Sequence, residues 1–105
     1  MTRILALCVI VFLIPACTWV NLTAPAEKVR ILSLDEVKNC QRVGTTTVST
    51  KATVGGIKRK YLKIQEELNT LARNGAIDLN GDTVVPITSQ EDGKQVFDVY
   101  RCINP

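Results

Sequence analysis

The residues of this sequence best suited to chemistry are its four cysteines, because no histidine is present to act as a general base or metal ligand. They are Cys8, Cys17, Cys40 and Cys102. A cysteine thiol can accept a lipid, pair in a disulfide or bind a metal ion. The surroundings of each cysteine therefore decide among these three uses.

Cys8 lies in a segment that has the layout of a signal peptide. Arg3 supplies a short positive region, and residues 4–14 form an uncharged apolar run. A helix of that length spans roughly 16 Å, about half the hydrocarbon thickness of a bilayer, so it is too short to cross one. Such a run is typical of the apolar region of a signal peptide. We therefore expect residues 1–16 to be removed, and Cys8 with them.

Cys17 has the surroundings of a lipidation site. Ile14-Pro15-Ala16-Cys17 resembles the lipobox of bacterial lipoproteins, in which a peptidase cuts before the cysteine and the thiol carries the lipid. The sequence thus predicts cleavage between Ala16 and Cys17 and a covalent lipid on Cys17, with no other cofactor. By resemblance to lipoprotein sorting in Gram-negative bacteria, Thr18 in place of aspartate indicates the outer membrane, with the domain facing the periplasm. Two alternatives stay open, namely a hydrophobic core helix and an ordinary signal peptide cut elsewhere.

Cys40 and Cys102 remain for the folded part of the chain. The compartment outside the inner membrane is oxidising, so two leftover thiols favour one disulfide. This bond would close a loop over most of the domain, which the chain-entropy estimate values at about 4 kcal/mol. The alternative, a redox or metal pair, fits poorly because the two residues lack a C-x-x-C spacing and histidine partners. We expect a disulfide and no metal.

The segment after Cys17 is expected to connect the lipid to a folded domain. Residues 18–27 have no sustained hydrophobic period and contain Pro25, which predicts a tether. Trp19 suits a membrane interface, or else packs on the domain. The predicted divisions are therefore a signal peptide over residues 1–16, a lipidated cysteine with its tether over 17–28, and a domain over 29–105.

A helical period is the clearest pattern in this domain. Apolar residues recur at steps of three and four from Ile57 to Leu79, which predicts an amphipathic helix of about 22 residues. Asn80-Gly81 closes it, with Gly81 in the left-handed position of the cap. Gly75, on the apolar face, indicates that another element packs closely there.

Residues with high β-propensity flank the predicted helix on both sides. An Asp-Gly pair at residues 92–93 predicts a hairpin, and Pro86 predicts an edge or outward-facing position. The predicted strands span residues 29–34, 40–50, 83–88 and 95–102. The order β-β-α-β-β predicts an α+β fold, in which one long amphipathic helix packs on a small, mainly antiparallel four-stranded sheet.

Three stretches of the domain resemble a known family. Val43-Gly44 follows the first domain cysteine, residues 73–85 join a helix end to a Gly-Asp-x-Val-Val strand, and Tyr100-Arg101 precedes the last cysteine. With the lipobox, these stretches resemble small bacterial lipoproteins catalogued mostly as a domain of unknown function, which usually have a glycine where this chain has Asn80. That group is similar to the outer-membrane sensor lipoprotein of the Rcs envelope-stress system. The resemblance covers residues 29–102 and implies an envelope location, this fold and, more distantly, stress sensing.

A basic cluster lies at the start of the predicted helix. Positive side chains there suit anionic lipid headgroups or an acidic protein partner, and the alternative is a solvated helix face. The cluster comprises Lys58, Arg59, Lys60 and Lys63. The formal charge of the whole chain is +3, which is too weak to indicate nucleic-acid binding.

Catalysis has little support in the residue types. Ser33, Ser49 and Ser89 have no histidine to activate them. Asp78 and Asp82 fall on the predicted helix and at its cap, where the sequence indicates no cleft for acid–base work. We therefore expect a non-catalytic, membrane-anchored lipoprotein whose domain binds an envelope protein or cell-wall component, or senses envelope stress. The alternative is a structural or accessory subunit of an envelope or secretion complex.

Overall fold

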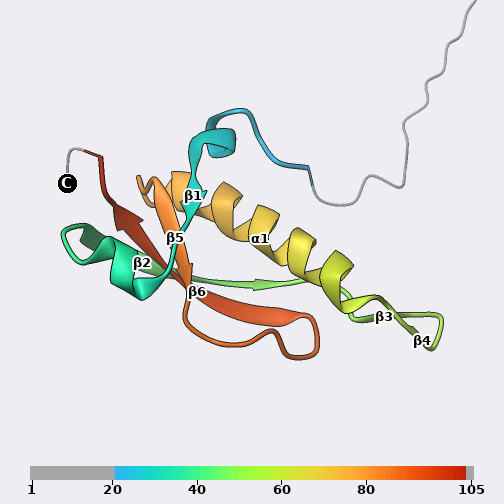
Figure 1. Ribbon diagram of the computed structural model, residues 1–105. Coiled ribbons are helices and arrows are strands. Elements are labelled where there is room, and N and C mark those ends of the chain that lie inside the picture. The colour runs from blue at the N-terminus through green and yellow to red at the C-terminus, as the bar shows by residue number, and fades with distance from the viewer. Residues whose placement is uncertain (1–20, 104–105) are drawn as a thin grey trace, which may run out of the picture.

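The computed structural model describes residues 21–103 (Figure 1). The predicted signal peptide, the cleavage site at Ala16 and Cys17, and Trp19 lie outside the described residues. Within them, one α-helix packs on one face of a four-stranded sheet, and a separate two-stranded hairpin stands beside the helix start. The predicted α+β fold is confirmed.

The main sheet has the strand order β1-β5-β6-β2. The pairs β2–β6 and β5–β6 are antiparallel, whereas β1 pairs in parallel with β5. The sheet is therefore mixed, with its first strand added at the edge beside the third predicted strand. The strands are β1 (Arg30–Ile31), β2 (Gln41–Ser49), β5 (Thr83–Pro86) and β6 (Lys94–Arg101).

The first strand is much shorter than the predicted range 29–34. It ends because Ser33 caps the start of a 3₁₀-helix, η2 (Leu34–Val37). The backbone N–H of Ser33 donates to the carboxylate of Glu36, 2.9 Å away, in a capping box. This bond lowers the pKa of Glu36 below its ordinary value. The capping box thus places Ser33 and Leu34 in the start of a 3₁₀-helix, although their β-propensity predicted a strand.

The helix α1 (Tyr61–Asp78) begins four residues later than the hydrophobic period predicts. Ile57 pairs instead with Val54 in a hairpin made of β3 (Thr53–Val54) and β4 (Ile57–Lys58). The chain reverses at Gly55 and Gly56, whose φ angles are 59° and 81°, values that L-residues with side chains rarely adopt. The period therefore misassigned Ile57, because the glycine turn returns the chain before the helix starts.

The C-terminal end of α1 differs from the prediction in which residue takes the left-handed conformation. That residue is Asn80, with φ of 60°, and not Gly81. Gly81 is needed for another reason: a Cβ atom there would lie 2.2 Å from Cγ1 of Val99. Asn80 turns the chain, and Gly81 lets it pass close to β6.

The hydrophobic core lies between α1 and the sheet. Leu68, Ala72 and Ala76 of the helix and Phe97 and Val99 of β6 are fully buried in one cluster. Gly75 allows the close approach that its position predicted, because a Cβ there would meet Oγ1 of Thr46 at 3.1 Å. The small residues at 72, 75 and 76 thus bring the second half of the helix near the sheet.

The segment expected to be a free tether packs on the domain from residue 21 onward. A short 3₁₀-helix, η1 (Pro25–Lys28), buries Ala26 completely in the core cluster. Arg73 of α1 donates to the backbone oxygens of Val29 and Glu27, both at 2.9 Å. In Figure 1 this segment (blue) lies on the side of α1 away from β2 and β6. The lack of a hydrophobic period and the presence of Pro25 gave no signal that contacts to the backbone hold this segment.

Candidate functional site

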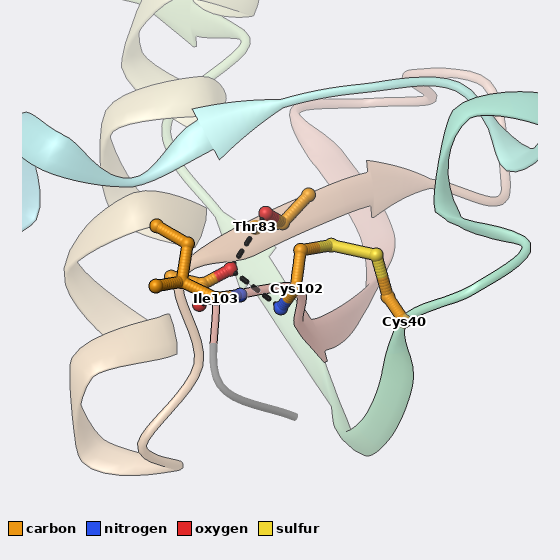
Figure 2. Close-up of a disulfide and its surroundings, with 5 residues drawn as sticks. Cys40, Thr83, Cys102 and Ile103 are labelled. Carbon is orange, nitrogen blue, oxygen red and sulfur yellow. Dashed lines mark hydrogen bonds between the residues drawn. A yellow bond between two sulfur atoms is a disulfide. The ribbon is translucent and has the colours of Figure 1, made fainter.

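Cys40 and Cys102 form the predicted disulfide at one end of the sheet (Figure 2). Cys40 directly precedes β2 and Cys102 directly follows β6, and the neighbouring residues Gln41 and Arg101 face each other in the sheet. The two Cα atoms are 4.4 Å apart, within the range that a disulfide spans. Strand pairing therefore brings the two cysteines together without any special loop.

The Asp82 carboxylate organises the chain next to this disulfide. It accepts hydrogen bonds from the backbone N–H groups of Cys102 and Ile103, both at 2.9 Å, and from the hydroxyl of Thr83 at 2.8 Å. Figure 2 shows Thr83, Cys102 and Ile103 converging there. Burial raises the pKa of Asp82, but these three donors outweigh burial and leave the pKa below its ordinary value. With its oxygens engaged in this way, the carboxylate holds the backbone of Cys102 and Ile103 beside Thr83.

The four members of the basic cluster line one surface hollow, but their side chains have different partners. Arg59 turns inward and forms an ion pair with the carboxylate of Glu67 on α1. The side chains of Lys58, Lys60 and Lys63 remain on the surface. The charge of Arg59 thus neutralises a buried carboxylate of this chain, and the contact of the basic cluster with an anionic surface stays a prediction.

The ion pair between Arg59 and Glu67 fastens the β3–β4 hairpin to the helix. Besides the ion pair, Glu67 accepts a hydrogen bond from the hydroxyl of Thr50 at 2.7 Å, and Arg59 donates to the backbone oxygen of Lys51 at 2.9 Å. The Arg59 guanidinium lowers the pKa of Glu67, more than burial raises it, and the Thr50 hydroxyl lowers it further. The two ends of the hairpin are thus held by one buried polar group.

Replacing Glu67 with glutamine flattens the dependence of stability on pH. Because the pKa of Glu67 in the folded state lies below its ordinary 4.5, its contribution is fully present above pH 4.5 and is lost as the pH falls through the folded value. Urea unfolding at neutral and acidic pH should show a steeper fall for the wild type than for Glu67→Gln. The exposed neighbour Glu66, changed to glutamine, is the matched control and keeps the wild-type slope. Parallel curves for the wild type and Glu67→Gln would contradict this role.

Exposed apolar side chains surround the three surface lysines. Ile57 is 73% exposed and Leu62 is 77% exposed, and Val54 is about half-exposed. A surface hollow is lined by Val54 and Ile57 together with the basic cluster. We call Val54, Ile57, Lys58, Lys60, Leu62 and Lys63 the tip surface, since the hairpin extends past the start of α1 in Figure 1.

Metal binding and membrane spanning are two other roles to consider for the described residues. No group of three or more acidic, histidine or cysteine side chains in residues 21–103 is arranged to hold a metal ion. Over the same residues, no helix is long and apolar enough to cross a membrane. The hollow and the exposed apolar and basic side chains around it make the tip surface the candidate site of the described residues.

Comparison with known proteins gives the family. The model of a family described as "Domain of unknown function (DUF4156)" matches residues 20–102. The chain belongs to this DUF4156 family. No curated protein matches, and no solved structure does either. The matched range begins beside Asn21, where the described chain packs on the helix, and it ends at Cys102 of the disulfide.

Sequence patterns missed the parts of the DUF4156 domain that depend on distant partners. The hairpin had a visible signal in Gly55-Gly56, but Ile57 fitted the helical period equally well. The pairing of Arg59 with Glu67 had no signal, because no pattern indicated that Arg59 precedes the helix and turns back onto it. Ile57, one apolar residue of the tip surface, was assigned to the buried helix face for the same reason.

Proposed function

We propose that this DUF4156 protein is a lipoprotein of the bacterial cell envelope, lipidated at Cys17 and anchored in the outer membrane facing the periplasm. Its domain acts as a non-catalytic binding or stress-sensing module. The proposal extends the finding that the chain carries a domain of unknown function.

The use of the cysteines carries this proposal. Cleavage before Cys17 leaves three cysteines in the mature chain, of which Cys40 and Cys102 are joined to each other. A structural disulfide suits an oxidising compartment outside the inner membrane. Cys17 then remains as the thiol that follows an apolar leader and a lipobox-like sequence, which supports lipid attachment at that residue.

The chemistry of the described domain supports binding rather than catalysis. The chain contains no histidine, and the Asp82 and Glu67 carboxylates accept hydrogen bonds from several donors each. Both carboxylates have a pKa held below its ordinary value, whereas a general acid near neutral pH needs a raised one. The exposed tip surface has the composition of a contact site instead.

Labelling with radioactive palmitate in a Gram-negative host tests the lipid anchor. We expect label in the wild-type mature protein and none in Cys17→Ser, because serine has no thiol for the lipid. Cys8→Ser is the matched control, since Cys8 lies in the leader and the variant should keep the label. An unlabelled wild type that still begins with Met1 would overturn the proposal, as would label retained by Cys17→Ser.

A further inference from the structure

The tip surface combines positive charge with exposed apolar area. Lys58, Lys60 and Lys63 surround the hollow that Val54 and Ile57 line. The carboxylate of Glu66 lies near, with its Oε1 3.8 Å from Nζ of Lys63, and the carboxylate of Glu67 is paired with Arg59. Anionic phospholipid surfaces attract such lysines electrostatically and accept apolar side chains at the headgroup level.

The start of α1 adds to this positive potential. The helix begins at Tyr61 with no acidic residue in its first turn and no side-chain cap. The positive end of the helix dipole is therefore not offset locally, and it lies beside Lys60 and Lys63. The charge of the tip surface thus comes from side chains and backbone together.

Two members of the tip surface, Leu62 and Lys63, lie on the helix face that holds the segment leading to Cys17. Leu62 and Arg73 are separated by eleven residues, and so are Lys63 and Asn74, a spacing of about three turns that places each pair on one line along the helix. Arg73 holds Val29 and Glu27, and Asn74 holds the backbone of Asn21 and Thr23, both at 3.0 Å. Arg73 and Asn74, which hold the N-terminal segment, therefore lie about 16 Å along the helix axis from Leu62 and Lys63.

The chain between Cys17, the proposed lipid site, and Asn21, which Asn74 holds, is short. Four peptide links separate Cys17 from Asn21, and four extended residues span at most about 14 Å. A lipid on Cys17 would therefore keep Asn21 within that distance of the bilayer surface. The helix face that carries both Asn74 and Lys63 would then be held close to the headgroups.

We propose that the tip surface docks on the headgroups of the anionic bilayer that holds the protein's own lipid anchor, giving the domain two points of attachment. This inference rests on the proposed lipidation of Cys17. The bilayer is favoured over an acidic protein because the short link keeps it next to this helix face, whatever protein is present. Docking fixes the orientation of the domain and leaves the opposite face of the sheet directed away from the membrane.

Fluorescence quenching in vesicles tests this second contact. The mature lipidated protein, with Trp19→Phe, is reconstituted with Ile57→Trp as the reporter, a change that the high exposure of Ile57 should tolerate. Thr47→Trp is the control reporter, since Thr47 is exposed on β2 between Thr46 and Val48, which face the helix. Vesicles of brominated phosphatidylcholine, with or without an equal amount of phosphatidylglycerol, provide the quencher.

We expect strong quenching of Ile57→Trp in the vesicles with phosphatidylglycerol, weak quenching in those without it, and weak quenching of Thr47→Trp in both. Adding Lys58→Gln and Lys63→Gln should shift the ratio of docked to undocked domains by roughly tenfold or more toward undocked. The matched pair Lys38→Gln and Lys94→Gln, two exposed lysines outside the tip surface, should leave quenching unchanged.

The possible failures are distinguishable. If the protein floats with the vesicles but Ile57→Trp is no more quenched than Thr47→Trp, docking is refuted and the anchor stands. Quenching that ignores phosphatidylglycerol, or that survives Lys58→Gln with Lys63→Gln, refutes the charge-dependent contact. If a photo-crosslinker at residue 57 captures an acidic protein in cells while quenching is absent, that protein replaces the bilayer as the occupant. A protein that carries no lipid and does not float refutes the proposed function, and the docking with it.

Discussion

Replacing Cys40 and Cys102 together with alanine lowers the free energy of unfolding by about 4 kcal/mol. The disulfide joins residues 62 positions apart, so its loss frees most of the described chain in the unfolded state. A small domain has a total stability of only about 5–15 kcal/mol, so the variant should unfold at a much lower urea concentration.

The wild type under reducing conditions is the internal control for this double substitution. Its urea midpoint should fall to that of Cys40→Ala with Cys102→Ala, and the reducing agent should not change the midpoint of the variant. If the variant and the oxidised wild type unfold at the same urea concentration, the bond does not stabilise the domain as described.

Gly81→Ala should destabilise the domain by roughly 3 kcal/mol, at the upper end of what overpacking usually produces. The new Cβ would lie 2.2 Å from Cγ1 of the fully buried Val99 and 3.1 Å from the backbone oxygen of Tyr100. Neither neighbour can move freely, because both belong to β6, which pairs with strands on both sides. Thermal unfolding followed by circular dichroism measures the effect.

Asn80→Gly is the matched control for Gly81→Ala at the neighbouring position. Asn80 is exposed and has φ of 60°, a conformation that glycine adopts readily, so its replacement should change stability by no more than about 0.5 kcal/mol. If Asn80→Gly destabilised the domain more than Gly81→Ala, the roles assigned to the two residues would have to be exchanged.

The parts of the fold that sequence predicts are those set by local patterns. Alternating apolar residues at Phe97 and Val99 and the turn at Asp92-Gly93 are local signals, and the structure has β6 and its preceding turn at these places. The parallel pairing of β1 has no local signal, because only two residues pair and their partner strand lies beyond the helix. The burial of Ala26, a residue of η1, was missed because a single small buried residue produces no hydrophobic period.

The candidate site follows the same division. Three contiguous basic residues and Lys63 were visible in the sequence, and three of the four stay on the surface. That Arg59 instead neutralises Glu67 depends on where the helix begins, which Ile57 obscured by fitting the helical period. A correct helix start would have indicated both the inward arginine and the exposed apolar side chains of the hairpin.

The long loop that the disulfide closes between Cys40 and Cys102 has a consequence for proteolysis. The exposed hairpin turn at Gly55-Gly56 lies between Cys40 and Cys102 in the sequence. A protease that cleaves this turn would produce two fragments that remain covalently joined through the sulfur atoms. The nicked product would keep its halves together on a non-reducing gel and separate only after reduction, so a single clip would not by itself release half of the protein from its place.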